Sequence, residues 1–138
     1  MNKPLVSVVI PACNEEHFIT KCLESLKAQT YKGPVEIIVV DNNSTDKTSE
    51  LARAAGATVL FERTPGVCPA RDTGTQAAKG DIVVSTDADT TFPSDWLERI
   101  VTAFEQNPKA VGVAGSFIFD NPPWWAKPSV TKKNVWDD

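Results

Sequence analysis

The chain has 138 residues, of which 41% are hydrophobic and 23% are charged, so it is long and apolar enough to bury one core. Its formal net charge of −4 lacks the basic excess that binding to a phosphate backbone needs, so we expect no nucleic-acid partner. Three cysteines and one histidine fit neither a disulfide framework nor a zinc site. Free cysteines favour a cytoplasmic protein. Any metal would have oxygen ligands, which favours Mg²⁺ or Mn²⁺.

Short apolar strands and amphipathic helices alternate along most of the chain. In chain order, the patterns predict a strand at 5–12, a helix at 14–30, a strand at 35–41, a loop and helix within 42–56, a strand at 57–62, a helix at 69–80, a strand at 81–87, a helix at 94–108 and a strand at 110–119. The strands are continuous apolar runs, which is typical of sheets covered on both faces. The sequence therefore predicts an α/β domain with a mainly parallel sheet and helices on both faces.

Individual residues indicate where these helices begin and end. Asn14 gives the first helix a polar opening, and Ser94 is a suitable N-cap for the last helix. Gly56 and Gly80 are each expected to end a helix. Gly74 is unusual, because a glycine inside a helix costs about 1 kcal/mol relative to alanine.

Residues 121–138 differ from the preceding domain, which we place at residues 1–120. This tail is rich in proline and lysine and holds three of the four tryptophans. Exposed aromatic side chains at such density usually cover a surface. We therefore expect the tail to self-associate or to contact a membrane, which would place the protein at the inner face of the membrane. No apolar run is long enough to cross a bilayer.

Polar residues follow three of the predicted strands. Residues 11–15 end the first strand, residues 41–46 follow the second and residues 87–89 follow the fourth. In an open α/β sheet, ligands bind outside the carboxyl ends of the strands. The sequence therefore predicts that carboxylates and amides gather at this edge of the sheet, which we call the rim.

Asp87 and Asp89 stand where an apolar strand ends. An isolated pair of this kind is most often a polar turn that caps the next segment. At the end of a buried strand, however, residues two apart point to the same side, and two close negative charges are unfavourable without a counter-ion. A divalent cation held by both carboxylates is the functional alternative.

Other polar residues near the rim each have two interpretations. Asp41 ends the second strand, where its carboxylate could accept a hydrogen bond from a nucleobase or from the backbone. Arg71 could form a surface salt bridge, or it could point to the rim and steady a phosphate or Asp87. Cys13 and Cys68 are interpreted as small packing groups, because no base accompanies either thiol.

Four blocks carry a resemblance to a known family: VSVVIPACNEEHFITKCLESLKAQT, EIIVVDNNSTDKTSELA, PARDTGTQAAKGDIVVSTDADT and PSDWLERIV. Over about residues 5–119, the chain resembles the nucleotide-sugar-binding half of inverting family 2 glycosyltransferases, which have the Rossmann-like GT-A fold. The resemblance implies transfer of a sugar from a nucleoside-diphosphate-sugar donor to a saccharide, lipid or protein acceptor. It also implies a divalent cation, Mn²⁺ or Mg²⁺, as the cofactor.

The resemblance implies contacts to the nucleoside from two loops. The first loop, which lies along the nucleoside in the family, is matched by Pro11, Ala12, Asn14 and Glu15. Asp41 matches the aspartate that contacts the base. Asn43 stands where a second base-contacting residue, acidic or small, is usual.

The resemblance also implies a cation site. Asp87 and Asp89 match the Asp-x-Asp motif of the family, in which Asp89 would be a metal ligand and Asp87 would contact the ribose or complete the metal site. Arg71 matches the arginine of an Ala-Arg-Asn-x-Gly segment, in which Asp72 replaces the asparagine.

The general base of the family has no match in this sequence. It lies in the second half of the domain, and after residue 119, where the resemblance ends, the only acidic residues are Asp120, Asp137 and Asp138, in a different context. The resemblance therefore implies a truncated chain that binds the donor but does not complete sugar transfer. The alternative is a non-catalytic nucleotide-binding module of the same fold. A phosphorylation receiver domain is disfavoured, because it needs an acidic pair after the first strand, where this chain has PACNEE, and a lysine at the end of a late strand, where VGVAGSF has none.

Overall fold

The computed structural model describes residues 2–115, and the account below is confined to them. The chain divides into two units, Met1–Thr102 and Ala103–Asp138, and the sheet belongs to the first. The elements of the described part are, in order, β1 (Val6–Ala12), α1 (Ile19–Lys27), β2 (Val35–Asp41), α2 (Thr48–Ala54), β3 (Thr58–Phe61), α3 (Val67–Ala77), β4 (Ile82–Ser85) and α4 (Trp96–Gln106).

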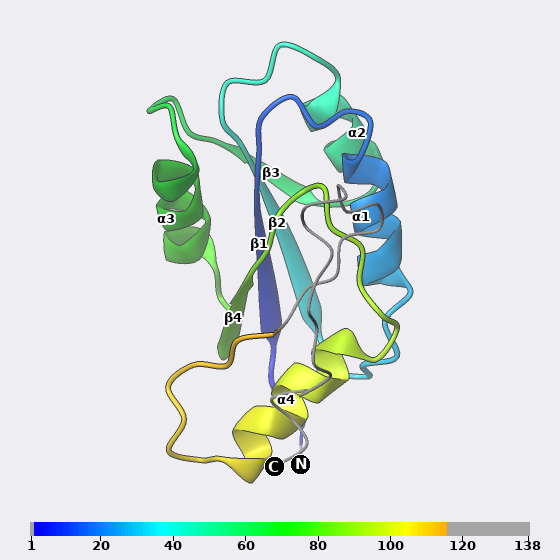
Figure 1. Cartoon of the computed structure of the whole chain (residues 1–138), viewed down its shortest axis with the longest axis vertical. Coiled ribbons are helices and arrows are strands. Elements are labelled where there is room, and N and C mark those ends of the chain that lie inside the picture. The colour runs from blue at the N-terminus through cyan, green and yellow to red at the C-terminus, as the bar shows by residue number, and fades with distance from the viewer. Residues whose placement is uncertain (1, 116–138) are drawn as a thin grey trace, which may run out of the picture. The chain divides into compact units, whose positions relative to one another are not determined.

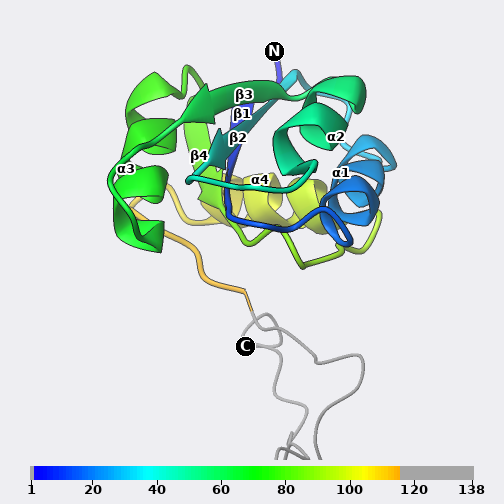
Figure 2. The same ribbon diagram turned by 90° about the horizontal axis from the view of Figure 1, so that it is seen from above.

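The strands of the first unit form one parallel sheet in the order β3-β2-β1-β4 (Figure 1). The connections through α1 and α2 move outward from β1 to β2 and β3, whereas the connection through α3 returns to the other side of β1. As a result α3 covers one face of the sheet, and α1 and α2 cover the other (Figure 2). The predicted parallel α/β sheet with helices on both faces is confirmed. Its strand order reverses beside β1, where such sheets bind ligands.

The central strand β1 is buried along its whole length, as its unbroken apolar sequence predicts. Alternate residues of a strand point to opposite faces. Val8 and Ile10 belong to a core cluster with Ile19 and Leu23 of α1. On the opposite face, Val9 of β1 contacts α3. Strand β1 therefore contributes to the core on both faces of the sheet.

Gly74 allows α3 to lie close to this opposite face. A Cβ atom at this position would lie 2.3 Å from Cγ1 of Val9 and 2.9 Å from Cγ2 of Val40. Real Cβ atoms do not come so close to a side chain in a packed interior. The glycine that weakens the isolated helix is thus needed for its packing against β1 and β2.

Three predicted boundaries differ from the structure by two to five residues. The first helix begins at Ile19 and not at Asn14, whose φ of 55° lies outside the helical region. The third helix ends at Ala77, so Gly80 lies beyond it, and α4 begins at Trp96, two residues after Ser94. The helix end at Gly56 is confirmed, since this residue follows α2 with a φ of 88°.

The second unit is described only as far as residue 115. Residues 110–115 form no strand, so the predicted strand at 110–119 is wrong over this part, and its remainder lies outside the described residues. The tail at 121–138 also lies outside them. Within the described residues, no helix is both long enough and apolar enough to cross a membrane.

Candidate functional site

A cleft of about 620 Å³ opens at the rim of the sheet, a volume ordinary for a small-molecule site. Its lining residues are Pro11, Ala12, Cys13, Glu15, Asn42, Asn43, Arg63, Pro65, Gly66, Val67, Ala70, Asp87, Ala88 and Asp89. Most of them follow a strand, so the order of the strands in the sheet determines the order of these residues along the cleft. The residues after β3 lie at one end, and those after β4 lie at the other.

The nine predicted site residues divide into two groups. Those that line the cleft are Pro11, Ala12, Glu15, Asn43, Asp87 and Asp89. Asn14, Asp41 and Arg71 do not line it, although each holds a residue or loop that does. The ligand contacts implied for all nine remain predictions.

Three carboxylates meet at the end of the cleft formed by β1 and β4. Asp87 and Asp89 are exposed, whereas Ala88 between them is buried in the core, so both aspartates face the cleft. Burial raises the pKa of the Glu15 carboxyl, and the negative charges of Asp89, Asp46 and Asp87 raise it further. We call Glu15, Asp87 and Asp89 the acidic end.

Arg71 is the basic partner of this end. From α3 it donates one hydrogen bond to the Ser85 hydroxyl and another to Oδ1 of Asp87, with which it forms an ion pair. Arg71 thus forms the salt bridge that one interpretation predicted, and its partner is Asp87 at the rim, as the other predicted. Asp72 lies on the exposed side of the same helix, where it accepts a hydrogen bond from Gln76.

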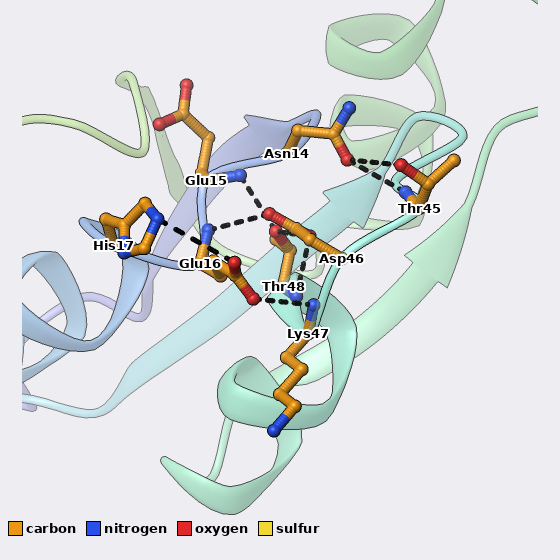
Figure 3. A network of polar contacts seen from close by, with 8 residues as sticks. All are labelled: Asn14, Glu15, Glu16, His17, Thr45, Asp46, Lys47 and Thr48. Carbon is orange, nitrogen blue, oxygen red and sulfur yellow. Dashed lines mark hydrogen bonds and ion pairs between the residues drawn. The ribbon is translucent and has the colours of Figure 1, made fainter.

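The loop after β1 is held by the loop after β2 (Figure 3). Oδ1 of Asn14 accepts a hydrogen bond of 2.8 Å from the Thr45 amide, and the Glu15 amide donates one of 2.8 Å to Oγ1 of Thr48. The Asp46 carboxylate accepts the Glu16 amide at 3.1 Å. The backbone of Glu15 is thus fixed, while its carboxylate points away from this network (Figure 3).

Asp41 is only 4% exposed, and both of its carboxylate oxygens have partners within the fold. Oδ1 accepts the Ser44 amide at 2.9 Å, and Oδ2 accepts the Ser49 hydroxyl. The backbone hydrogen bond, one of the two interpretations from sequence, is therefore present. It shapes the turn between β2 and α2.

Asn42 was not singled out by the sequence analysis, yet it organises the other end of the cleft. It is 7% exposed, and its amide group donates to the carbonyls of Glu62 and Thr64, each at 2.8 Å, and accepts the Gly66 amide at 2.8 Å. Asn43, at a φ of 62°, donates to the carbonyl of Arg63 at 3.0 Å. We call Asn42 and Asn43 the amide clamp, because they hold the loop that follows β3.

The interpretation of Cys13 and Cys68 as packing groups is wrong, since both thiols are exposed. Cys13 lines the cleft beside Glu15, and Cys68 lies in the first turn of α3. The thiol packed in the core is that of Cys22, whose pKa is raised to about 12 mainly by burial.

The acidic end fits a divalent cation on its donor chemistry. Carboxylate oxygens are the ligands that Mg²⁺ and Mn²⁺ favour, and a cation would neutralise three negative charges that face one space. Among residues 2–115, no group of three or more acidic, cysteine or histidine side chains is placed so that it could hold a metal ion. A cation here would therefore need further oxygen ligands, as Mg²⁺ sites that use one or two carboxylates with phosphates do.

Comparison with known proteins gives a consistent family match. Residues 7–136 match the family model described as glycosyl transferase family 2. The glycosyltransferase AglE of Haloferax volcanii is 39% identical over 106 residues, which cover 72% of this chain and 35% of AglE. The chain spans about a third of the length of AglE and a similar share of EpsJ of Bacillus subtilis.

Solved structures with the same fold carry nucleotides and metal. The mannosyltransferase PcManGT from Pyrobaculum calidifontis, in complex with GDP-Man and Mn²⁺, is 33% identical with a TM-score of 0.69 over 75% of this chain and 33% of its own. Glucosyl-3-phosphoglycerate synthase from Mycobacterium tuberculosis, in complex with Mn²⁺, UDP and glucosyl-3-phosphoglycerate, is 33% identical with a TM-score of 0.60 over 75% and 40% of the two chains.

Proposed function

Because the chain belongs to glycosyl transferase family 2 and its sheet is that of the GT-A fold, we propose that it binds the nucleoside-diphosphate-sugar donor of an inverting sugar transfer, together with a divalent cation. The observation that carries this proposal is the acidic end of the cleft. Its three carboxylates belong to residues that line one cleft beside β1, where the strand order reverses, and the charges of Asp87 and Asp89 act on Glu15. We propose a cytoplasmic setting, which would keep the exposed thiols of Cys13 and Cys68 reduced.

We assign the diphosphate of the donor to the acidic end. The diphosphate and the carboxylates are both anionic, so they can lie together only with a cation between them. The carboxylates of Asp87 and Asp89 would therefore bind the donor through Mn²⁺ or Mg²⁺. When bound, the cation would stabilise the negative charge that the diphosphate gains as the sugar leaves. The ion pair of Arg71 with Asp87 holds that carboxylate in place.

We assign the nucleoside to the opposite end. Neighbouring strands of a sheet are about 4.8 Å apart, so the three spacings from β4 to β3 amount to roughly 14 Å. A nucleoside diphosphate extended along the rim would then reach the residues that follow β2 and β3. Pro11 and Ala12, which lie between the two ends, would contact its middle.

Acceptor activation is not assigned to these residues. An inverting transfer needs a general base beside the acceptor hydroxyl. Glu15, Asp87 and Asp89 are the described carboxylates that line the cleft, and all three belong to the acidic end. The acceptor therefore stays open among saccharide, lipid and protein.

Calorimetry of the full chain with GDP and UDP, with and without Mn²⁺, tests the proposal. We expect binding that depends on Mn²⁺ and that falls at least about tenfold in Asp89→Asn, because contacts to charged groups are worth about 1.5–3 kcal/mol. Asp95→Asn, at an exposed position outside the cleft, is the matched control. If neither nucleotide binds in Mn²⁺, or if Asp89→Asn binds as the wild type does, the proposal fails.

A further inference from the structure

We propose that one face of α1 positions the Asp89 carboxylate for the cation of the donor site. The residues on this face are Cys22, Ser25 and Gln29, which we call the α1 ladder. They are positioning residues, because none of them lines the cleft and they act on a ligand only through the loop that they hold. The inference rests on the proposed function and adds to it the residues that prepare the site.

The Asp89 carboxylate has no support of its own. It belongs to residues 86–95, which connect β4 to α4 without forming helix or strand and which we call the acidic loop. Asp87, near the start of this loop, is paired with Arg71. Within the described part of the chain, by contrast, the Asp89 side chain makes no hydrogen bond and no ion pair. The backbone of the loop therefore determines where this carboxylate lies.

Before Asp89, the acidic loop is anchored to the core through Cys22. The Cys22 thiol lies 3.7 Å from the carbonyl oxygen of Asp87, to which it donates a weak hydrogen bond. Ala88 is 2% exposed and belongs to the same core cluster as Cys22. One polar contact and one apolar contact thus hold the backbone on this side of Asp89.

After Asp89, the acidic loop is held by the other two members of the α1 ladder. The Phe92 amide donates a hydrogen bond of 3.2 Å to the Ser25 hydroxyl. The side-chain amide of Gln29 donates one of 2.7 Å to the Pro93 carbonyl. Only two residues separate Asp89 from Phe92, so a backbone that is fixed on both sides leaves Asp89 few conformations.

Gln29 also fixes the helix that follows the acidic loop. Its Oε1 accepts the amide of Leu97, the second residue of α4, at 2.9 Å. The first amides of a helix have no partner within that helix, and a side chain just before it often supplies one. Here the side chain comes from the end of α1 instead. Gln29 therefore holds the loop and the start of α4 in one arrangement.

The spacing of the α1 ladder explains why one helix can hold the whole loop. Its members are three and four residues apart, which places them on one face of a helix. Cys22 and Ser25 lie within α1, and Gln29 follows its end at Lys27 by two residues. A carboxylate that is held in place before the cation arrives loses less conformational freedom on binding. The ladder should therefore increase the affinity of the site without touching the ligand.

The test is a double-mutant cycle with Gln29→Met and Asp89→Asn, measured by calorimetry of the full chain in Mn²⁺ with inorganic pyrophosphate, GDP and UDP. We expect Gln29→Met to weaken binding about fivefold, the factor that one ordinary hydrogen bond is worth. The factor should be the same for all three ligands, because each presents a diphosphate to the acidic end. Gln106→Met, at the exposed end of α4, is the matched control.

The second arm of the cycle distinguishes positioning from general stability. In the Asp89→Asn background, Gln29→Met should weaken binding less than about twofold, because the carboxylate that it positions is gone. A role in stability alone would weaken binding equally in both backgrounds. Titrations at a temperature well below the melting transition of every variant ensure that all of the protein is folded.

Ser25 provides an independent test with a conservative rescue. Ser25→Ala removes the acceptor of the Phe92 amide and should weaken binding of all three ligands about threefold. Ser25→Thr keeps a hydroxyl and should recover most of this loss. Glu24→Ala, at the neighbouring exposed position of α1, should leave binding unchanged.

The contrary results separate this inference from the proposed function. Unchanged binding in both Gln29→Met and Ser25→Ala overturns the inference and leaves the donor site intact. Equal losses with and without the Asp89 carboxylate overturn it as well, because the ladder would then only stabilise the fold. A wild type that binds none of the three ligands in Mn²⁺ overturns the proposed function itself.

Discussion

At the acidic end of the cleft, three carboxylates face one space, and an arginine pairs with one of them. At the opposite end, the amide clamp makes its hydrogen bonds within the fold and leaves one arginine, Arg63, facing the cleft. The first end gathers like charges, of which the ion pair offsets one, whereas the hydrogen bonds of the second end are complete without a ligand. Each end should therefore respond to different changes.

The difference bears on how the cleft achieves both affinity and selectivity. Repulsion between like charges is relieved by a counter-ion, so the acidic end supplies binding that depends on metal. Hydrogen bonds that are complete in the unbound protein make the clamped end rigid, so this end can select ligands by their shape. Helix α3 connects the two ends, because it begins beside the clamped loop and carries Arg71.

Moving α3 should weaken both ends at once and have the largest effect. In Gly74→Ala, the new methyl group would collide with Val9 and Val40 and push the helix from the sheet. Such overpacking costs typically about 1–3 kcal/mol. We expect a lower melting temperature and weaker binding of both pyrophosphate and nucleotide in Mn²⁺.

Two further variants make this prediction specific. Thr75→Ala, at the next and exposed position of α3, should leave both properties nearly unchanged. Adding Val9→Ala to Gly74→Ala removes the nearest colliding atoms and should restore part of the binding. If Gly74→Ala is as stable as the wild type, α3 is not held as closely as the structure indicates.

The fold and the acidic end could be predicted from the sequence because both depend on local patterns. Continuous apolar runs determine buried parallel strands, and residues at their ends must meet at the rim. For the same reason the sequence predicts Asp87 and Asp89 at the rim, and both line the cleft. The helix starts were less predictable, since Asn14 makes its hydrogen bonds to a loop about thirty residues away.

The amide clamp could not be predicted in the same way. Asn42 lies in a run of polar residues that suits an ordinary turn, and its partners follow the next strand. Only the pairing of β2 with β3 brings these residues together. The one local signal is an asparagine immediately after a buried strand, where a polar side chain needs partners.

A smaller effect is expected when Arg71, the basic partner of the acidic end, is replaced. Arg71→Met should change the free energy of unfolding by less than about 1 kcal/mol, because the pair with Asp87 is largely exposed. It should raise the affinity for Mn²⁺ alone about fivefold, since a charge at about 4 Å in a water-like medium is worth about 1 kcal/mol. Titration with Mn²⁺ in the absence of nucleotide measures this change. The affinity of Arg71→Lys for Mn²⁺ should lie between those of the wild type and Arg71→Met. A weaker affinity for Mn²⁺ would show that Arg71 organises the carboxylates more than it repels the cation.

The three thiols offer a measurement that needs no substitution at all. Cys13 lines the cleft, whereas Cys68 is exposed outside its lining, so both should react with a maleimide in the native protein. Cys22 should react only after unfolding, because it is buried and its pKa is raised to about 12. Nucleotide and Mn²⁺ at ten times the dissociation constant should slow labelling of Cys13 about tenfold, the fraction of protein left unbound, and should leave Cys68 unaffected.

The ligand used in this labelling separates the two ends of the cleft. Cys13 follows β1, next to Glu15, so it lies between the acidic end and the clamped loop. Pyrophosphate with Mn²⁺ should therefore protect it less than a complete nucleoside diphosphate does, because only the latter extends past β1. Equal protection of Cys13 and Cys68 would mean that binding tightens the whole domain. If neither thiol is protected at saturating nucleotide, the donor does not lie along the rim.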